Sequence, residues 1–250
     1  MNPTTDNVIQ CASLIREAKS IVALTGAGIS TSAGIPDFRG PKGLYVTRQY
    51  DPDKVFDVEH FYRDQRDFFE FARDYCQLED RISPSPAHFF LAKLEEQGKL
   101  KGIITQNIDC LHERAGSKQV IELHGSIWHS YCLDCRKEFS FEQMKAKIAS
   151  EDVPHCECGG VIKPDIVFFG EDVKGMAEAG LLAKAADLFF VIGSSCVVYP
   201  AAMIPTMTMG KIVIVNKGRV DLLSGDVVLE VDEDIDAFFK EVERCLEREQ

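Results

Sequence analysis

The sequence lacks long hydrophobic runs, an excess of positive charge, internal repeats and low-complexity segments. No apolar stretch in the 250 residues reaches the roughly 18 residues that span a membrane. Lys and Arg number 28 against 40 Asp and Glu, a net charge of −12 that argues against a nucleic-acid-binding surface. Residues 1–11 lack the basic-then-apolar pattern of a secretion signal. We therefore expect a cytoplasmic protein without membrane or nucleic-acid partners.

The composition is that of an ordinary globular protein, with 45% hydrophobic and 27% charged residues. This length allows one or two domains with a substantial core. The surplus of acidic residues is compatible with lysine-rich peptide substrates, and it is equally compatible with a role in solubility alone. Nine cysteines in a chain expected in the cytoplasm indicate metal binding or free thiols rather than a disulfide framework.

An apolar run followed by a glycine-rich turn lies near the N-terminus. Residues 21–24 are typical of a buried parallel strand, and Gly26 and Gly28 follow them. Glycine allows a sharp turn and a close approach to a ligand, and residues 30–32 could cap a helix whose N–H groups face a pyrophosphate. This predicts a dinucleotide site, although Thr31 stands where the usual Gly-x-Gly-x-x-Gly pattern needs glycine. A glycine turn without a ligand is the alternative.

Further apolar runs alternate with helical patterns, which predicts an α/β fold: a Rossmann-like parallel sheet with helices on both faces. The expected strands are residues 21–24, 102–105, 120–123, 188–192, 211–215 and 227–231, and the expected helices are residues 8–18, 87–96 and 235–245. Ligands of open α/β sheets bind beyond the carboxyl ends of the strands. The residues expected to meet there are Gln106, Asn107, Asp109, His124, Gly193, Ser194, Ser195 and Asn216.

Two segments interrupt this alternation. Residues 41–83 carry aromatic side chains at roughly helical spacing, which predicts short helices around a local apolar core. Residues 131–160 contain two cysteine pairs, and four thiolates from two such knuckles suit a structural tetrahedral zinc site. The second pair is one residue more closely spaced than the first, so His155 is the alternative to Cys156 as the fourth ligand. The four candidate ligands are Cys132, Cys135, Cys156 and Cys158.

Six blocks of sequence occur in a distinctive order. They are Gly-Ala-Gly-Ile-Ser at 26–30, Gly-Ile-Pro-Asp-Phe-Arg at 34–39, Thr-Gln-Asn-Ile-Asp at 105–109, Leu-His-Gly at 123–125, Lys-Pro-Asp-Ile-Val-Phe-Phe-Gly-Glu at 163–171 and Gly-Ser-Ser at 193–195. Together they resemble the signatures of the sirtuins, a family of NAD-dependent protein deacylases. The resemblance covers about residues 21–216.

The resemblance implies an NAD-dependent protein-lysine deacetylase that uses NAD as a co-substrate and holds a structural zinc ion. In the implied reaction, the acyl oxygen of acetyl-lysine attacks the nicotinamide ribose and displaces nicotinamide. His124 then activates a ribose hydroxyl, which attacks the acyl carbon. The products are nicotinamide, O-acetyl-ADP-ribose and free lysine, and nicotinamide is also the expected inhibitor.

The resemblance also implies a set of site residues by motif match. The implied catalytic residues are His124 and Asn107. The residues implied to contact NAD are Ala27, Thr31, Phe38, Arg39, Gln106, Ile108, Asp109, Ser194, Ser195, Asn216, Lys217 and Ile235. The residues implied to hold the acyl-lysine are Val167, Phe169, Gly170 and Val198.

The implied domain division has three parts. Residues 1–40, 84–128 and 161–250 form the NAD-binding domain, residues 41–83 form a cofactor loop and a small helical module, and residues 129–160 form the zinc-binding module. The helical and zinc-binding modules together make the smaller domain.

Three functions other than deacetylation are the alternatives. A dehydrogenase would hold nicotinamide for hydride transfer and release the cofactor intact. A non-catalytic NAD sensor on the same fold is predicted to lack the general base or the acid of the nicotinamide pocket, but His124 and Asp109 are both present. A protein mono-ADP-ribosyltransferase shares the first step of the reaction, so it stays open as an alternative.

The resemblance bears on the acyl group as well. Sirtuins that remove succinyl groups resemble one another in a Tyr-x-x-Arg pair within the helical module, where this chain has Asp74 and Gln77. Tyr45 and Arg48 have the same spacing but lie in the expected cofactor loop. An aspartate repels a carboxylate, so the sequence predicts a preference for acetyl over succinyl groups.

Overall fold

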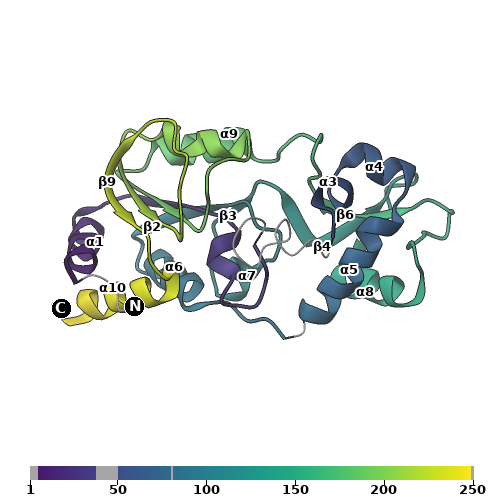
Figure 1. Cartoon of the computed structure of the whole chain (residues 1–250), viewed down its shortest axis with the longest axis horizontal. Helices are drawn as coiled ribbons and strands as arrows, with labels where there is room; N and C mark the ends of the chain where they lie inside the picture. The colour runs from purple at the N-terminus through teal and green to yellow at the C-terminus, as the bar shows by residue number, and fades with distance from the viewer. Residues whose placement is uncertain (1–4, 38–49, 80, 249–250) are drawn as a thin grey trace.

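The computed structural model describes residues 5–37, 50–79 and 81–248. Phe38, Arg39, Tyr45 and Arg48, which were singled out from the sequence, lie outside these residues. The described chain forms two lobes side by side along the long axis of the molecule, a larger one that contains the first and the last of the described residues and a smaller one (Figure 1).

In the described part of the chain, six parallel strands form the sheet of the larger lobe, in the order β3-β2-β1-β7-β8-β9. They are β1 (Ile21–Thr25), β2 (Leu100–Thr105), β3 (Val120–Glu122), β7 (Leu188–Ile192), β8 (Lys211–Val215) and β9 (Asp226–Val231). The predicted parallel sheet is confirmed. The strand order reverses between β1 and β7, and such a switch point is where open α/β sheets bind ligands.

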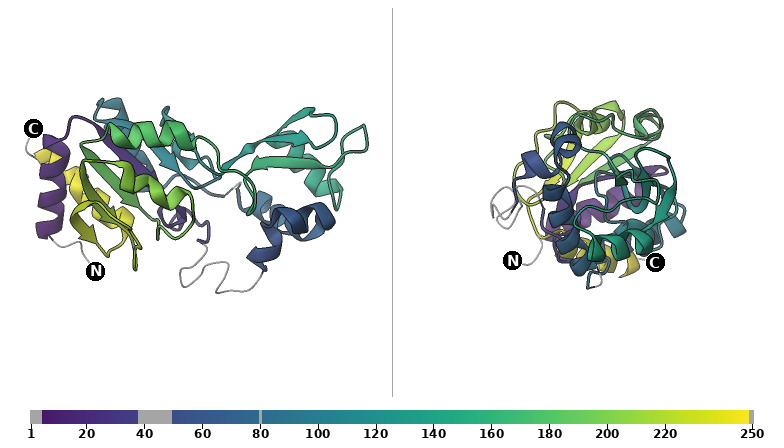
Figure 2. Two further views of the ribbon diagram at one scale, coloured as in Figure 1. Left: turned by 90° about the horizontal axis from the view of Figure 1, so that it is seen from above. Right: turned by 90° about the vertical axis from the view of Figure 1, so that its right-hand side faces the viewer.

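Helices cover both faces of this sheet (Figures 1 and 2). On one face lie α1 (Thr5–Glu17), α6 (Pro86–Glu96) and α10 (Ile235–Arg248), and on the other lie α9 (Met176–Lys184) and the 3₁₀ helix η2 (Ala201–Met207). Successive side chains of a strand point to opposite faces. Accordingly Ile21 and Ala23 of β1 join the apolar cluster under the first face, while Val22 and Leu24 join the cluster under the second.

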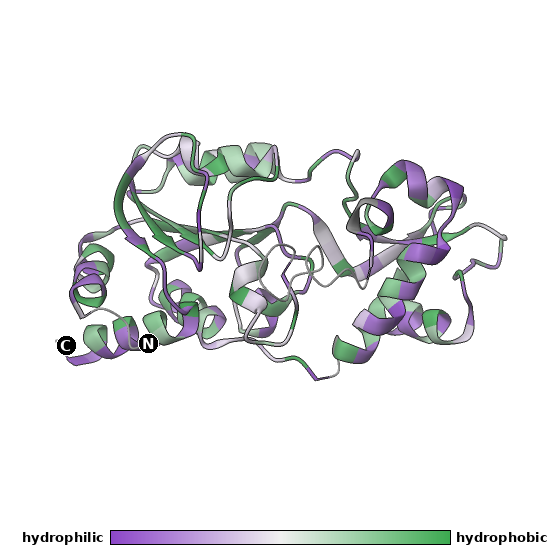
Figure 3. Cartoon of the chain, in the orientation of Figure 1, coloured by the Kyte–Doolittle hydropathy of each residue, from purple (hydrophilic) through white to green (hydrophobic). Residues whose placement is uncertain are grey.

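The hydropathy of the sequence follows this layering. Figure 3 shows the strands of the large sheet as mainly hydrophobic, whereas α1 and α10 carry hydrophilic and hydrophobic residues in alternation. All five residues of β1 and all five of β7 are buried. Near-continuous apolar runs of this kind are what strands covered on both faces require.

The smaller lobe combines a second sheet with short helices. In the described residues its three strands are antiparallel in the order β5-β4-β6. The elements are α3 (Pro52–Val55), α4 (Val58–Arg63), α5 (Arg66–Glu79), β4 (Gly125–Cys132), β5 (Glu138–Ser140), α8 (Phe141–Ser150) and β6 (Ile162–Ile166). The expected aromatic core is present, because Phe61 packs against Phe68 and Phe168 with ring centroids 5.6 and 5.0 Å away.

The second sheet reaches beyond the range expected for the zinc-binding module. Residues 125–128 and 162–166, assigned from the sequence to the NAD-binding domain, lie in β4 and β6 of the smaller lobe. The strand β6 runs directly into residues 167–170, so the connection between the lobes and the expected substrate segment are continuous.

One expectation from the glycine turn is wrong. No helix capped by residues 30–32 follows in the described residues up to position 37; instead the single 3₁₀ turn η1 (Ala27–Ser30) leads into turns that end at Gly34, whose φ is +99°. The reason lies in Ser30, which is buried and donates its hydroxyl to Asp109 rather than accepting a backbone N–H as a cap. The turn is therefore anchored to the neighbouring strand end.

Candidate active site

Three strand ends meet at the switch point of the large sheet. The turn after β1 contacts the turn after β7 backbone to backbone, with Gly28 N–H donating to Gly193 O over 2.9 Å. A Cβ at Gly28 would lie 2.7 Å from Gly193 Cα, and Gly193 itself has a φ of +64°. Glycine is needed at both positions, because a side chain would push the two turns apart.

Gln106 connects the end of β2 to residues that follow β7 and β3. Its side-chain amide donates to Ser194 Oγ over 3.0 Å, and its backbone carbonyl lies 2.8 Å from His124 Nδ1. Gln106, Ser194 and His124 are thus brought together as the sequence predicts.

The hydrogen bond to Gln106 determines the tautomer of His124. A carbonyl oxygen only accepts, so Nδ1 carries the ring hydrogen and the lone pair of Nε2 is available as a base. Burial lowers the pKa of His124 below its ordinary value, while the hydrogen bond to Gln106 acts in the opposite direction. The ring is therefore neutral at pH 7, as a general base must be before it accepts a proton.

A second chain of hydrogen bonds joins Asn107 to Asp109 through Ser30. Asn107 Nδ2 donates to Ser30 Oγ over 3.1 Å, and the Ser30 hydroxyl donates to Asp109 Oδ2 over 2.7 Å. The N–H of Leu111 donates to the other carboxylate oxygen over 3.0 Å. Burial raises the pKa of Asp109, and these hydrogen bonds partly offset that effect. These hydrogen bonds hold the Asn107 amide and the Asp109 carboxyl group side by side after the end of β2.

Beneath these groups lies a buried polar network that the sequence interpretation missed. His112 Nε2 lies 2.8 Å from Thr25 Oγ1, which donates to Thr105 Oγ1 over 2.9 Å, and Thr105 in turn accepts the N–H of Asn107. His88 packs on His112 with ring centroids 4.7 Å apart. The available signal was a threonine at the end of each of the adjacent strands β1 and β2, where a buried hydroxyl needs a partner.

The residues implied to bind the adenosine half follow β7 and β8, except for Ile235, which begins α10. Asn216 is buried and its side-chain amide donates to Gly218 O over 3.0 Å, while Lys217 is exposed. Ser195 accepts the N–H of Asp221 with its backbone oxygen over 3.0 Å. Ile235 begins α10 and packs into the core, with 8% of its surface exposed.

The other predicted residues that the structure describes lie in η1 and the turn after it, after β2, in the turn after β6 and before η2. Ala27 is in η1, Thr31 is exposed and donates to Gly28 O over 3.0 Å, and Ile108 is partly buried against the aromatic core of the smaller lobe. Val167 N–H donates to His124 O over 2.8 Å, which places the expected substrate segment beside the histidine. Phe169 is 43% exposed, Gly170 has a φ of +95°, and Val198 precedes η2.

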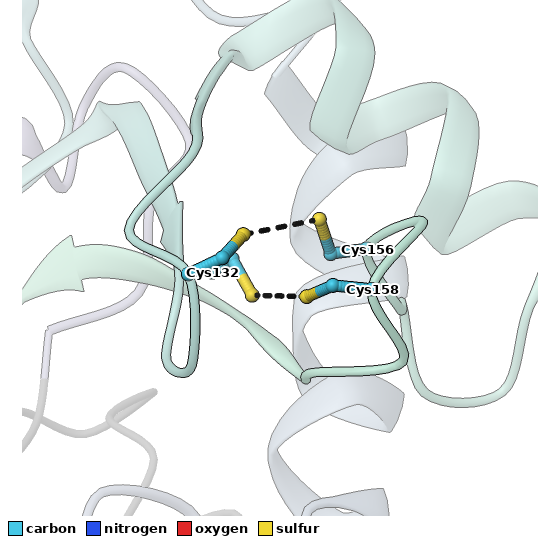
Figure 4. Close-up of side chains that lie close together, drawn as sticks. Cys132, Cys156 and Cys158 are labelled. Atoms are coloured by element: carbon cyan, nitrogen blue, oxygen red, sulfur yellow. Dashed lines mark hydrogen bonds between the residues drawn. The ribbon is translucent and has the colours of Figure 1, made fainter.

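The four cysteines converge in the smaller lobe. Their sulfur atoms all lie within 4.8 Å of one another, with Cys132 and Cys158 separated by 3.5 Å and Cys135 and Cys156 by 3.7 Å (Figure 4). Four thiols in this arrangement match the ligand set of a structural zinc site, which leaves no position for a catalytic water.

His155 does not take part in this cluster. Its Nδ1 lies 2.6 Å from Val153 O, and the close approach of Cys156 to Cys135 makes a histidine ligand unnecessary. Gly160 explains how the tighter second knuckle closes, because a Cβ there would lie 2.7 Å from Cys132 Sγ. The residues present therefore fit zinc with four cysteine ligands.

The helices were also compared with the length and hydrophobicity of a membrane span. Within the described residues, none combines the two properties to the degree that crossing a bilayer requires.

Comparison with known proteins identifies relatives over most of the chain. The chain is 49% identical over 212 residues to an NAD-dependent protein deacetylase of Thermotoga maritima, covering 82% of this chain and 85% of that protein. It is 44% identical over 219 residues to an NAD-dependent protein deacetylase of Pyrobaculum aerophilum, covering 85% of both chains.

Solved structures give the same result. A structure of Sir2 with a p53 peptide and NAD⁺ is 43% identical and superposes with a TM-score of 0.85, covering 96% of this chain and 97% of that one. A structure of Sir2Tm bound to a propionylated peptide is 41% identical, with a TM-score of 0.83 and the same coverage. The model of the Sir2 family matches residues 26–200. The chain belongs to the Sir2 family.

Proposed function

We propose that this protein is an NAD-dependent protein-lysine deacetylase. The proposal is supported by its membership of the Sir2 family and by relatives at 49% and 44% identity that are named NAD-dependent protein deacetylases. The single observation that carries it is the hydrogen bond from His124 Nδ1 to Gln106 O. This bond leaves His124 Nε2 available as a base at the carboxyl edge of the large sheet.

The residues at the strand ends fit an NAD molecule. NAD supplies an anomeric carbon from which nicotinamide departs. In this proposal Asp109 and the backbone at Ile108 hold the carboxamide, and Gln106 and Asn107 orient the ribose hydroxyls. Ser194, Ser195, Asn216, Lys217 and Ile235 surround the adenosine half, and Ala27, Thr31, Phe38 and Arg39 complete the phosphate and nicotinamide contacts.

The protein substrate is proposed to be an acetyl-lysine peptide. Val167, Phe169, Gly170 and Val198 would line the path of the acyl-lysine side chain, and the peptide backbone would pair with the segment after β6 as an added strand. The acyl oxygen attacks the ribose carbon as nicotinamide leaves. His124 Nε2 then takes the proton of a ribose hydroxyl, which makes that oxygen a nucleophile toward the acyl carbon.

We extend this proposal in two respects. Nicotinamide is a product of the first, reversible step, so it should inhibit deacetylation. A cytoplasmic location is proposed as well, because a zinc site made of four thiols requires reduced sulfur. Binding of nucleic acid and of membranes is not part of the proposed function.

The proposed function is tested by measuring the mass of a peptide substrate. An acetyl-lysine peptide and its unmodified counterpart are incubated with the protein, with and without NAD⁺, and the mass of each peptide is measured. We expect loss of the acetyl group only when NAD⁺ is present and no change in the unmodified peptide. Addition of ADP-ribose to either peptide, or to the protein itself, without loss of acetyl would favour a mono-ADP-ribosyltransferase and contradict the proposal.

A further inference from the structure

Lys163 is a charged side chain in the interior of the smaller lobe. It belongs to β6, has 1% of its side chain exposed and is among the largest fully buried side chains of the described residues. Burial lowers the pKa of Lys163, whereas Glu171 favours its charged form. A buried ammonium group is costly unless it is paired and hydrogen-bonded, so its contacts indicate what it does.

The contacts of Lys163 close the turn that follows β6. Its Nζ donates to Ile166 O over 2.7 Å and to Glu171 Oε2 over 2.9 Å, and it lies 4.3 Å from the centre of the Phe168 ring. The same Glu171 oxygen accepts the N–H of Phe168 over 2.8 Å. The ion pair therefore holds the carbonyl oxygen of Ile166 and the N–H of Phe168 at the buried side of the turn.

This turn also contacts two other parts of the molecule, the residue His124 and the helical module. Val167 N–H donates to His124 O over 2.8 Å, and Phe169 N–H donates to Phe56 O over 2.7 Å. Val58 N–H returns a hydrogen bond to Phe169 O over 3.1 Å. The turn thus connects the small sheet to His124 and to the helical module. Its conformation depends on the ion pair between Lys163 and Glu171.

We infer that Lys163 and Glu171 are positioning residues that hold the peptide-binding edge formed by residues 167–170. The inference rests on the proposed function, because that edge is the proposed partner of the acetyl-lysine peptide. A buried ion pair adds little net stability compared with apolar residues of similar volume. Its contribution here is geometric: it presents the backbone of the turn in one conformation to an incoming strand, and a preorganised edge binds more tightly.

The experiment compares Lys163→Met, Glu171→Gln and Lys163→Arg in the full chain. Peptide affinity is measured by fluorescence polarisation of a labelled acetyl-lysine peptide, and steady-state kinetics give KM for peptide and for NAD⁺. Loss of charged hydrogen bonds at this edge should weaken peptide binding about tenfold in the first two variants and raise the peptide KM in parallel. The KM for NAD⁺ should stay unchanged, and Lys163→Arg should retain most of the affinity.

The matched control is Lys93→Met. It removes contacts of 2.8 and 2.7 Å to Glu243 and Glu247 between α6 and α10, away from the turn, and should lower stability without changing peptide affinity. Circular dichroism and zinc content establish that each variant is folded. If Lys163→Met does not fold, Glu171→Gln and the double variant Lys163→Met/Glu171→Gln decide the question.

Unchanged peptide affinity in folded Glu171→Gln, or equal increases in both KM values, would overturn the inference. A loss of kcat at unchanged peptide affinity would also overturn it. The binding measurement does not depend on turnover. A wild-type protein that binds the peptide in the predicted way but does not deacetylate it would therefore contradict the proposed function and leave this inference standing.

Discussion

At the scale of single residues, two side chains at neighbouring strand ends have separate tasks. His124 is a neutral base whose Nδ1 is occupied by Gln106 O, whereas Asp109 is a buried acid tied to Ser30 and Leu111. In the proposed mechanism Asp109 acts when nicotinamide is bound, and His124 acts only after nicotinamide has left. The two residues can therefore be separated by measuring each step alone.

The variant His124→Ala should lose most deacetylation, because general-base assistance contributes roughly 10²–10⁴-fold. It should keep part of the exchange of labelled nicotinamide into NAD⁺, which needs only the first step and an acetyl peptide. Asp109→Asn should lose exchange and turnover together. Both rates are measured beside wild type, with circular dichroism as a control for folding. Equal loss of exchange and turnover in folded His124→Ala would remove the base role from His124.

We expect single residues to determine the acyl preference as well. Asp74 and Gln77 are exposed on α5, and the Tyr50 hydroxyl donates to Asp74. Arg73, the neighbouring cation, donates to the backbone oxygens of Ile148 and Asp152 at the end of α8. We predict faster turnover of an acetyl peptide than of the same peptide carrying a succinyl group, because Asp74 repels the added carboxylate. Kinetics that favour the succinyl peptide would refute this.

At the scale of elements, the two cysteine knuckles form one unit with β4 and the turn before β6. Gly160 allows the second knuckle to approach Cys132, and all four sulfur atoms are close enough to share one ion. We predict one zinc ion per chain in protein purified without chelator, measured by elemental analysis. Structural zinc contributes on the order of 10 kcal/mol in isolated fingers, so its removal should lower Tm markedly.

Substitutions identify the fourth ligand. Cys156→Ser and Cys158→Ser should both lose zinc, whereas His155→Ala, the matched control in the same knuckle, should keep it. Retention of zinc by Cys156→Ser together with its loss in His155→Ala would show that the histidine is the ligand instead.

The packing of α6 against the short helix α7 (Leu111–Arg114) makes stability depend on pH. Burial lowers the pKa of His88 from 6.5 to about 4, with Asp236 opposing, and it lowers the pKa of His112 as well. Unfolding releases both rings to their ordinary pKa, so the unfolded chain binds protons that the folded chain does not. The stabilisation is therefore complete above pH 6.5 and is lost as the pH falls toward 4.

Each ring should reduce the free energy of unfolding by up to about 1.4 kcal/mol per pH unit in this window. Chemical denaturation between pH 7.5 and 5 measures the slope for wild type and for His88→Gln, whose amide oxygen can still accept the Ser85 N–H. We expect a smaller slope in the variant than in wild type. Identical slopes in wild type and His88→Gln would contradict the assignment.

Local sequence patterns predicted most of these helices and strands, because the residues that determine them are neighbours in the sequence. The runs at residues 188–192 and 212–215 are continuously apolar because both faces of these strands are covered in the fold. The prediction of a helix after the glycine turn was wrong because the backbone there is determined by a residue that is distant in the sequence. Ser30 is drawn to Asp109, 79 positions along the chain, and no local pattern contains that partner.

At the scale of the whole molecule, the site lies where the two lobes join. The sequence predicted that Gln106, Ser194 and His124 meet, because the carboxyl ends of parallel strands lie at one edge of the sheet. In the structure, Gln106 contacts both Ser194 and His124. The buried partners below that edge, among them His112 and Lys163, could not be recognised in advance. Their significance comes from burial and pairing across lobes and layers, which residue type and spacing do not encode.

The central claim is that the protein consumes NAD⁺ at the ribose in order to take an acetyl group from lysine. Mass spectrometry of the nucleotide products formed with an acetyl-lysine peptide tests this most directly. We predict one nicotinamide and one O-acetyl-ADP-ribose for every peptide that is deacetylated. Deacetylation that leaves NAD⁺ intact or yields its reduced form, or cleavage of NAD⁺ with the acetyl group still on the peptide, would contradict it.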